Sequence, residues 1–155
     1  MSIFPTTVLL ATDGSDDARL AATTAVDLAN STSSELHIVL VEEEAYVYDD
    51  PSHRSAVPRG YPLTDAELEH ELEQQARQRL DAEVERVRSA GGTVAEAHLR
   101  VGAAAREIVA LAEDIEAGLI AMGSRGLGGI RRALMGSVSD DVVRHAHCPV
   151  LVVRH

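Results

Sequence analysis

The chain has 155 residues, of which 45% are hydrophobic and 3% aromatic, so we expect one domain with an aliphatic core. All 14 of its basic residues are arginine, and 25 acidic residues bring the net charge to −11. Such a surface repels nucleic acid and anionic lipid, and neither is expected as a partner. Because the sequence contains no lysine, a Walker A lysine, a kinase strand lysine and a Schiff-base lysine are excluded.

Two further features bear on the environment of the protein. Cys148 is the single cysteine, the N-terminus lacks the pattern of a signal peptide, and no run reaches the roughly 18 apolar residues that span a membrane. These features predict a cytoplasmic protein. An acidic, lysine-free surface is typical of a halophilic protein, because salt screens its self-repulsion. The alternative is an ordinary acidic surface with a codon bias toward arginine.

The first half of the chain shows strand and helix patterns in turn. Residues 7–12 carry a continuous apolar run that predicts a buried strand. A turn at Asp13–Gly14–Ser15 follows, and Ser15 or Asp16 is placed to cap a helix with an alanine-rich face. A second strand is predicted from residue 35 to about residue 41.

A long irregular segment, residues 45–63, comes next and contains several prolines and a glycine. A loop of this length is a lid, a partner surface or a disordered segment. Thr64 and Glu67 form a capping box after it. The following helix carries its apolar residues on one face and stops near Gly91, and its many Glu and Arg side chains are predicted to form a solvated outer face.

The second half repeats the alternation. It predicts a strand over 93–101 near the sheet edge, a helix closed by Gly118, a buried strand over 118–122, a helix from about residue 138 and a last strand over 150–153. Alternating strands and helices predict an α/β fold, a parallel sheet with helices on both faces. We expect a single domain over residues 1–155.

The glycines that follow the fourth predicted strand have the spacing Gly123-x2-Gly126-x9-Gly136-Ser137. Glycine lets a backbone approach a ligand closely, and the N–H groups and dipole of a helix N-terminus attract anions. Ser124 and Arg125 lie inside this stretch and can add donors. Ser137 also fits a helix N-cap with Asp140 as its capping-box partner.

This glycine spacing resembles the phosphate-binding signature of the universal stress protein family, and the resemblance extends over essentially the whole chain. It implies the sheet order 3-2-1-4-5, with ATP phosphates on the glycine stretch from Gly123 to Ser137. It further implies that Asp13 binds the ribose, that the backbone of Val41 contacts adenine, and that a homodimer pairs through residues 150–153. The alternative for Asp13 is that its side chain only organises its own turn.

Acidic residues near the expected phosphates indicate a metal ion bound with the nucleotide. Asp140 and Asp141 suit the first turn of a helix but repel a triphosphate. Mg²⁺ resolves this conflict, because it bridges phosphates with one or two protein carboxylates.

No other motif predicts chemistry. His145 and His147 are two residues apart on a helix end and do not share a face, so a metal site there is disfavoured. The remaining histidines do not have a spacing typical of metal ligands; they are His37, His53, His70 and His98. We therefore predict no dedicated metal ligands and no catalytic residue.

Three functions fit the sequence. The first, which we expect, is an ATP-binding stress-response or signalling module with at most slow ATP hydrolysis. The second is a dimeric interaction module that uses no nucleotide. The third is an ATP-consuming enzyme of related fold, which the missing lysine and the lack of an evident general base disfavour.

Overall fold

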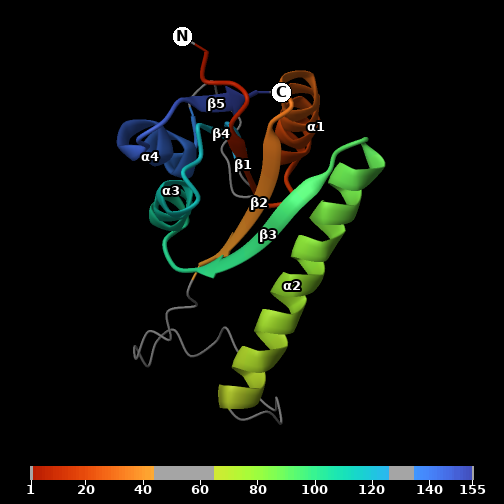
Figure 1. Ribbon diagram of the computed structural model, residues 1–155. Coiled ribbons are helices and arrows are strands. Elements are labelled where there is room, and N and C mark those ends of the chain that lie inside the picture. The colour runs from red at the N-terminus through yellow and green to blue at the C-terminus, as the bar shows by residue number, and fades with distance from the viewer. Residues whose placement is uncertain (1, 44–64, 126–134, 155) are drawn as a thin grey trace.

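The computed structural model describes residues 2–43, 65–125 and 135–154. Five parallel strands form one sheet in the order β3-β2-β1-β4-β5, as predicted (Figure 1). The elements are β1 Thr7–Thr12, α1 Asp16–Thr32, β2 Glu35–Glu42, α2 Asp65–Ser89, β3 Val94–Val101, α3 Ala104–Asp114, β4 Leu119–Gly123, α4 Ser137–His145 and β5 Val150–Val153.

Helices cover both faces of the sheet and divide the core into two layers. Val8 and Leu10 of β1 pack with α1 and α2, whereas Leu9 of the same strand packs with α3 and α4. A central parallel strand buried on both faces needs apolar side chains at successive positions, which explains the continuous run in its sequence. The predicted α/β class is confirmed.

Helix α1 packs closely because its buried face is built from small residues. The side chain of Ser15 accepts a hydrogen bond from the N–H of Ala18 and caps the helix, as one of the two predicted candidates. Ala21 and Ala25 are completely buried against the sheet. Short side chains at these positions let the helix axis approach the strands that carry the candidate site.

Helix α2 is longer than the strands beneath it. Its 25 residues span about 37 Å, whereas the eight residues of β3 span about 26 Å. Leu80 and Val84 are buried, but Leu72 in the N-terminal half is 46% exposed and does not reach the core as its spacing predicts. Figure 1 shows this half extending past the sheet. The predicted residue Thr64 and the loop 45–63 lie outside the described residues.

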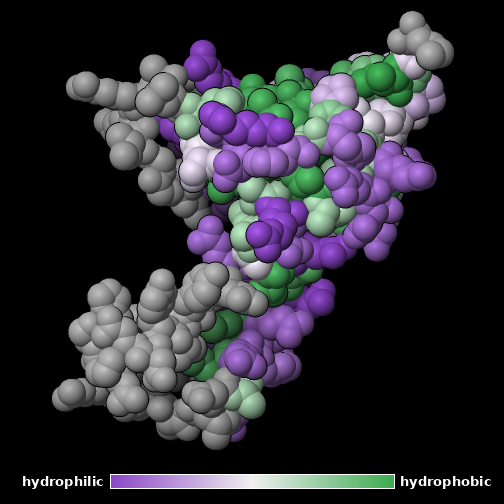
Figure 2. Space-filling view, turned by 90° about the vertical axis from the view of Figure 1, so that its left-hand side faces the viewer, coloured by the Kyte–Doolittle hydropathy of each residue, from purple (hydrophilic) through white to green (hydrophobic). Residues whose placement is uncertain are grey.

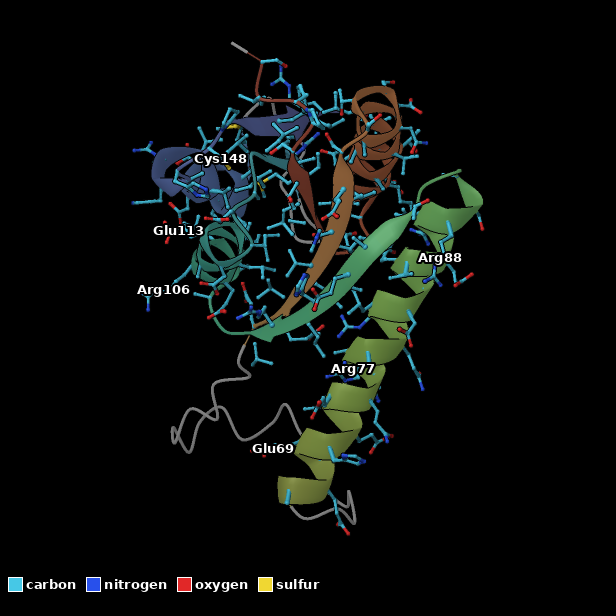
Figure 3. All side chains as sticks on the ribbon, in the orientation of Figure 1. Glu69, Arg77, Arg88, Arg106, Glu113 and Cys148 are labelled. Atoms are coloured by element: carbon cyan, nitrogen blue, oxygen red, sulfur yellow. The ribbon has the colours of Figure 1, made fainter. Side chains whose placement is uncertain are left out.

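The polar face of α2 is largely solvated. Figure 3 shows Glu69, Arg77 and Arg88 projecting from it. Hydrophilic side chains also cover much of the side of the molecule that α3 and α4 present (Figure 2). In the described part of the chain, no helix combines the length and the apolar character needed to cross a membrane.

Gly118 does not end helix α3, contrary to the prediction. The helix ends at Asp114, and Glu116 adopts the left-handed conformation with φ 53°. A Cβ on Gly118 would stand 2.1 Å from the Thr6 hydroxyl oxygen. Glycine suits this position because the Thr6 side chain packs directly against it.

Candidate functional site

The candidate site lies where the chain connections of the sheet change direction. Strands β1 and β4 are neighbours, but β1 continues through α1 to β2 on one side, and β4 continues through α4 to β5 on the other. The loops that leave these two strands therefore diverge. Ligands of open α/β sheets bind at the carboxyl ends of the strands beside such a switch.

Backbone contacts hold the strand ends and the start of α4 together. The N–H of Gly136 donates to the carbonyl oxygen of Ser124 over 2.6 Å, and the Ser15 hydroxyl donates to the carbonyl oxygen of Arg125 over 3.3 Å. The N–H of Ser124 donates to the carbonyl oxygen of Val153 in β5 over 2.9 Å. These contacts bring the predicted residues Ser124, Arg125 and Gly136 close together.

Asp13 directly follows β1, and Val41 lies near the end of the adjacent strand β2. The β1–β2 register pairs Thr12 with Leu40, so the next residues along the two strands are Asp13 and Val41. Both residues are half-buried. The expectation that one ligand contacts both stays a prediction.

Asp13 also organises its own turn, as the alternative interpretation states. The N–H of Ser15 donates to Oδ1 of Asp13 over 2.9 Å, and Gly14 between them has φ 80°. An ionised carboxylate offers about four acceptor positions on two oxygens. The turn role and the expected ribose role therefore do not exclude each other.

Ser124 holds the loop in place and is 1% exposed. Its hydroxyl donates to Oδ2 of Asp17 in the first turn of α1 over 2.7 Å. Its N–H and carbonyl groups bond to Val153 and Gly136. All of these groups are engaged within the protein, and the expected ligand role of Ser124 stays a prediction.

Gly123 has a packing role in addition to its predicted ligand role. A Cβ at this position would stand 2.8 Å from the carbonyl carbon of Asp17. Real Cβ atoms essentially never come so close, so the end of β4 can touch the start of α1 only through a glycine. Gly126 lies outside the described residues.

The start of α4 differs from the predicted capping box. Gly136 is the N-cap, and Ser137 is the first helical residue, so Ser137 is not the cap. The carboxylate of Asp140 bonds to Arg144 Nε over 2.9 Å instead of reaching back to the cap. The first N–H groups of any helix lack intrahelical partners and form the positive end of its dipole. In α4 this end adjoins the ends of β4 and β1.

Three polar residues that sequence reasoning did not select complete this region: Asp17, Glu83 and Ser139. Ser139 Oγ lies 2.8 Å from the carbonyl oxygen of Ser124 and 3.0 Å from that of Gly136. Oε2 of Glu83 accepts from the Thr12 hydroxyl over 3.2 Å. Ser139 thus links α4 to the start of the glycine loop, and Glu83 links α2 to the end of β1.

A signal for two of these residues was present in the sequence. Asp17 precedes buried Ala21 by one helical turn, and Glu83 precedes buried Val87 in the same way. Glu83 is only 6% exposed, so the prediction that the Glu and Arg side chains of α2 form a solvated outer face is wrong at this position. An acidic residue on the core-facing side of an amphipathic helix indicates a polar partner in the fold.

The histidines are also arranged differently from the prediction. His37 and His98 do form a constellation, because their ring nitrogens lie 3.1 Å apart on neighbouring strands. His145 Nδ1 lies 2.8 Å from the carbonyl oxygen of Asp141, within its own helix. Cys148 is half-buried, and burial raises the pKa of its thiol.

A parallel sheet whose switch point meets the start of a helix places the chain in the class of open, doubly wound α/β domains. Residues 5–154 match the Universal stress protein family, and the chain belongs to that family. Universal stress protein MJ0531 of Methanocaldococcus jannaschii is 33% identical over 147 residues, which cover 95% of this chain and 81% of that protein.

Solved structures agree with the family. The structure of the hypothetical protein MJ0577 has a TM-score of 0.78 at 25% identity and covers 99% of this chain and 98% of that one. A universal stress protein in complex with cAMP has a TM-score of 0.68 at 26% identity, over 97% of this chain and 98% of that one. A structure similar to this chain over nearly its whole length therefore binds an adenine nucleotide.

Proposed function

We propose that the chain binds ATP together with Mg²⁺ at the β1–β4 switch and acts as a stress-response or signalling module with little or no catalysis of its own. The observation that carries this proposal is the convergence of Asp13, Val41 and the first turn of α4 at one end of the sheet. The similar universal stress protein in complex with cAMP supports an adenine nucleotide as the ligand class.

The nucleotide would run from β2 to α4. Adenine would contact the backbone of Val41, and the ribose would bond to the carboxylate of Asp13. The phosphates would accept hydrogen bonds from loop N–H groups, including that of Gly126, and from the first turn of α4 at Ser137. Charge-assisted bonds of this kind are roughly twice as strong as neutral ones. Arg125, at the start of the loop, would add a cation.

The acidic groups near the phosphates fit the proposed Mg²⁺. Asp140 lies in the first turn of α4, and its bond to Arg144 reduces its repulsion of an anion. One carboxylate with phosphate oxygens and waters is a donor set that Mg²⁺ accepts. Bound there, the ion would neutralise phosphate charge, while the protein residues fix where the phosphates lie.

The homodimer through β5 is part of the same proposal. Pro149 and Val153 direct their carbonyl groups to β4, so strand alternation directs the N–H groups of Val150 and Val152 to the open edge. An exposed apolar edge is a template for a second strand. Two copies paired there would form one continuous sheet.

Titration calorimetry of the full chain tests nucleotide binding against the two other functions. ATP, cAMP and adenosine would be titrated with Mg²⁺ in molar KCl, and we expect saturable binding of ATP. No heat of binding for any of the three ligands would favour the nucleotide-independent interaction module. Steady release of ADP with a turnover rate typical of enzymes would favour an ATP-consuming enzyme instead.

A further inference from the structure

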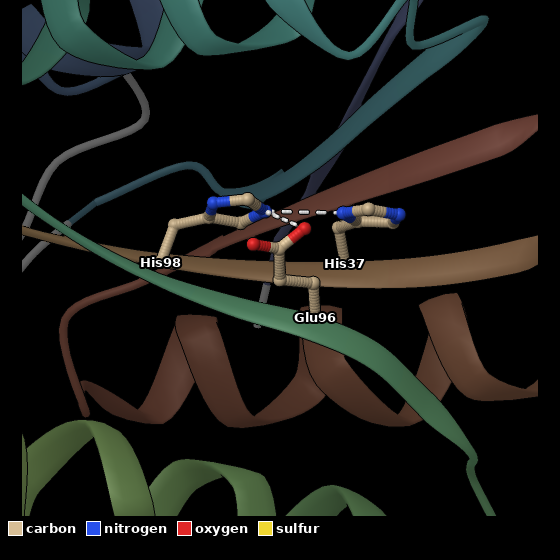
Figure 4. A group of neighbouring side chains, drawn as sticks. All are labelled: His37, Glu96 and His98. Atoms are coloured by element: carbon tan, nitrogen blue, oxygen red, sulfur yellow. Dashed lines mark hydrogen bonds and ion pairs between the residues drawn. The ribbon is translucent and has the colours of Figure 1, made fainter.

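A group of metal-type ligands lies on the sheet away from the candidate nucleotide site. His37 in β2 and His98 with Glu96 in β3 present ligand atoms that all lie within 4.8 Å of one another. Figure 4 shows the three side chains pointing to the same face of the sheet, away from α1 and α2. None of the three takes part in the proposed nucleotide site.

An irregularity in β3 creates this arrangement. Leu36 pairs with Val94, but the next residue of β2, His37, pairs with Glu96, so Ala95 is an extra residue in the edge strand. Side chains alternate between faces, and one extra residue moves every later side chain to the other face. Without it, Glu96 and His98 would point into the core between the sheet and the helices α1 and α2.

The distances suit a tetrahedral metal ion. His37 Nδ1 lies 3.1 Å from His98 Nε2, and Glu96 Oε2 lies 3.9 Å from the same His98 nitrogen. Two ligands bonded to zinc at 2.0–2.1 Å with a tetrahedral angle are about 3.3 Å apart. Small side-chain rotations therefore suffice to place one ion between the three groups.

A fourth residue supports the ligand role of His37. Oε2 of Glu35 lies 3.7 Å from His37 Nε2, the ring nitrogen that faces away from His98. The two groups are not hydrogen-bonded at this distance, but a small rotation of the exposed Glu35 side chain would let its carboxylate accept the Nε2 proton and leave the lone pair on Nδ1, as in the carboxylate–histidine–metal arrangements of known sites. Glu35 is thus a positioning residue.

Solvent access also fits a metal site. The two histidine side chains are each 11% exposed, whereas that of Glu96 is 64% exposed, so an ion can enter from solvent past the carboxylate.

We propose a binding site for one divalent transition-metal ion such as Zn²⁺. Its ligands are His37, His98 and Glu96, with a water molecule in the fourth position. Two histidines and one carboxylate with an open position form a donor set used for zinc. Bound there, the ion cross-links the edge strand β3 to β2 and stabilises that edge of the sheet.

The test is calorimetric titration of ZnCl₂ into the chelator-treated full chain without nucleotide. We expect one equivalent of Zn²⁺ to bind to the unmodified protein. The affinity for Zn²⁺ should fall at least about tenfold in Glu96→Gln and further in His98→Gln. In the positioning variant Glu35→Gln it should fall by about 10–100-fold. His145→Gln, which removes an exposed histidine in α4, should bind as the unmodified protein does. Because Glu96 is exposed, Glu96→Gln should remain folded and keeps the test decisive.

Co²⁺ gives a second readout on the same variants. A tetrahedral site should give an intense visible absorption in the unmodified protein and in His145→Gln, and that absorption should be lost in Glu96→Gln. Failure of the unmodified protein to bind Zn²⁺ would overturn the proposal. So would undiminished binding in both Glu96→Gln and His98→Gln, which would place the ion elsewhere.

Discussion

The end of β4 touches the start of α1 at Gly123 and Asp17, so closely that a Cβ on Gly123 would stand 2.8 Å from both the carbonyl carbon and the Cβ of Asp17. The next residue, Ser124, bonds to the Asp17 carboxylate over 2.7 Å. These contacts join β4 and α1 at the point where the glycine loop begins. The shape of the candidate nucleotide site therefore depends on packing inside the protein as well as on ligand contacts.

The first prediction concerns Gly123→Ala. The added methyl group has to displace the first turn of α1, and overpacking of this kind costs about 1–3 kcal/mol of the free energy of unfolding. Urea denaturation measures it. Gly136→Ala is the matched control, for which we expect a smaller loss of stability. Its Cβ would stand 3.1 Å from the nearest atom, the Ser124 carbonyl oxygen, and the φ of Gly136, −62°, is one that alanine adopts. Equal stability of the two variants would contradict this account of Gly123.

The second prediction concerns pH and His98. Burial is the largest cause that lowers the folded-state pKa of His98, so below pH 6.5 the unfolded chain binds a proton more readily than the folded chain. This contribution to stability is complete above pH 6.5 and is lost as the pH falls through the lowered pKa. The charged groups that act on His98 are Glu96, which opposes the shift, and His37 and Arg100, which add to it.

Thermal unfolding between pH 5 and 8, with a chelator present, measures the effect of His98. The melting temperature should rise with pH over the lower part of this range, and the rise should be smaller in His98→Gln. His70→Gln, which removes an exposed histidine of α2, should follow the unmodified protein. Parallel curves for the unmodified protein and His98→Gln would show that His98 does not titrate as inferred.

The third prediction concerns the proposed dimer. Val152→Pro removes an N–H group that strand alternation directs to the open edge and leaves the β4–β5 hydrogen bonds in place. We expect light scattering to find a dimer for the unmodified protein at micromolar concentration and a monomer for this variant. Val152→Ala keeps the N–H group and should remain largely dimeric. A monomeric unmodified protein would rule out pairing through β5.

The fourth prediction concerns salt. With a net charge of −11, the fold should become more stable as KCl rises to molar concentration, where the Debye length is about 3 Å. Differential scanning calorimetry should show a rising melting temperature. A non-ionic osmolyte at equal osmolality is the control and should raise it less. A melting temperature that stays level or falls in KCl would remove the support for a halophilic protein.

The sequence predicted the elements well because buried parallel strands leave continuous apolar runs, as in residues 7–12, which form β1 in the structure. It predicted the contacts between elements less well. The Ser124–Asp17 bond joins residues 107 positions apart, and the Thr12–Glu83 bond joins residues 71 positions apart. Neither pair has a local spacing that marks it, so only the folded sheet brings each pair together.

The histidine pair shows a second limit of sequence reasoning. His37 and His98 lie on one face only because Ala95 shifts the register of β3. A period-of-two pattern places Glu96 and His98 with Val94, on the opposite face of the sheet. No turn residue or glycine beside Ala95 marks it as an extra residue. The alternation of side chains in the sequence therefore does not reveal the histidine cluster.

The measurement that tests the central proposal most directly is calorimetric titration of ATP and adenosine into the unmodified protein, Asp13→Ala and Gly126→Ala, with Mg²⁺ and molar KCl. We predict that Asp13→Ala weakens both ligands alike, because both carry the ribose, and that Gly126→Ala weakens ATP far more than adenosine, because an added Cβ obstructs the phosphates. Asp13→Asn, whose amide oxygen can still accept from the Ser15 N–H, separates loss of the turn from loss of the ribose contact. Equal losses of ATP and adenosine in Gly126→Ala would place the phosphates elsewhere, and no ATP binding by the unmodified protein would contradict the proposed function.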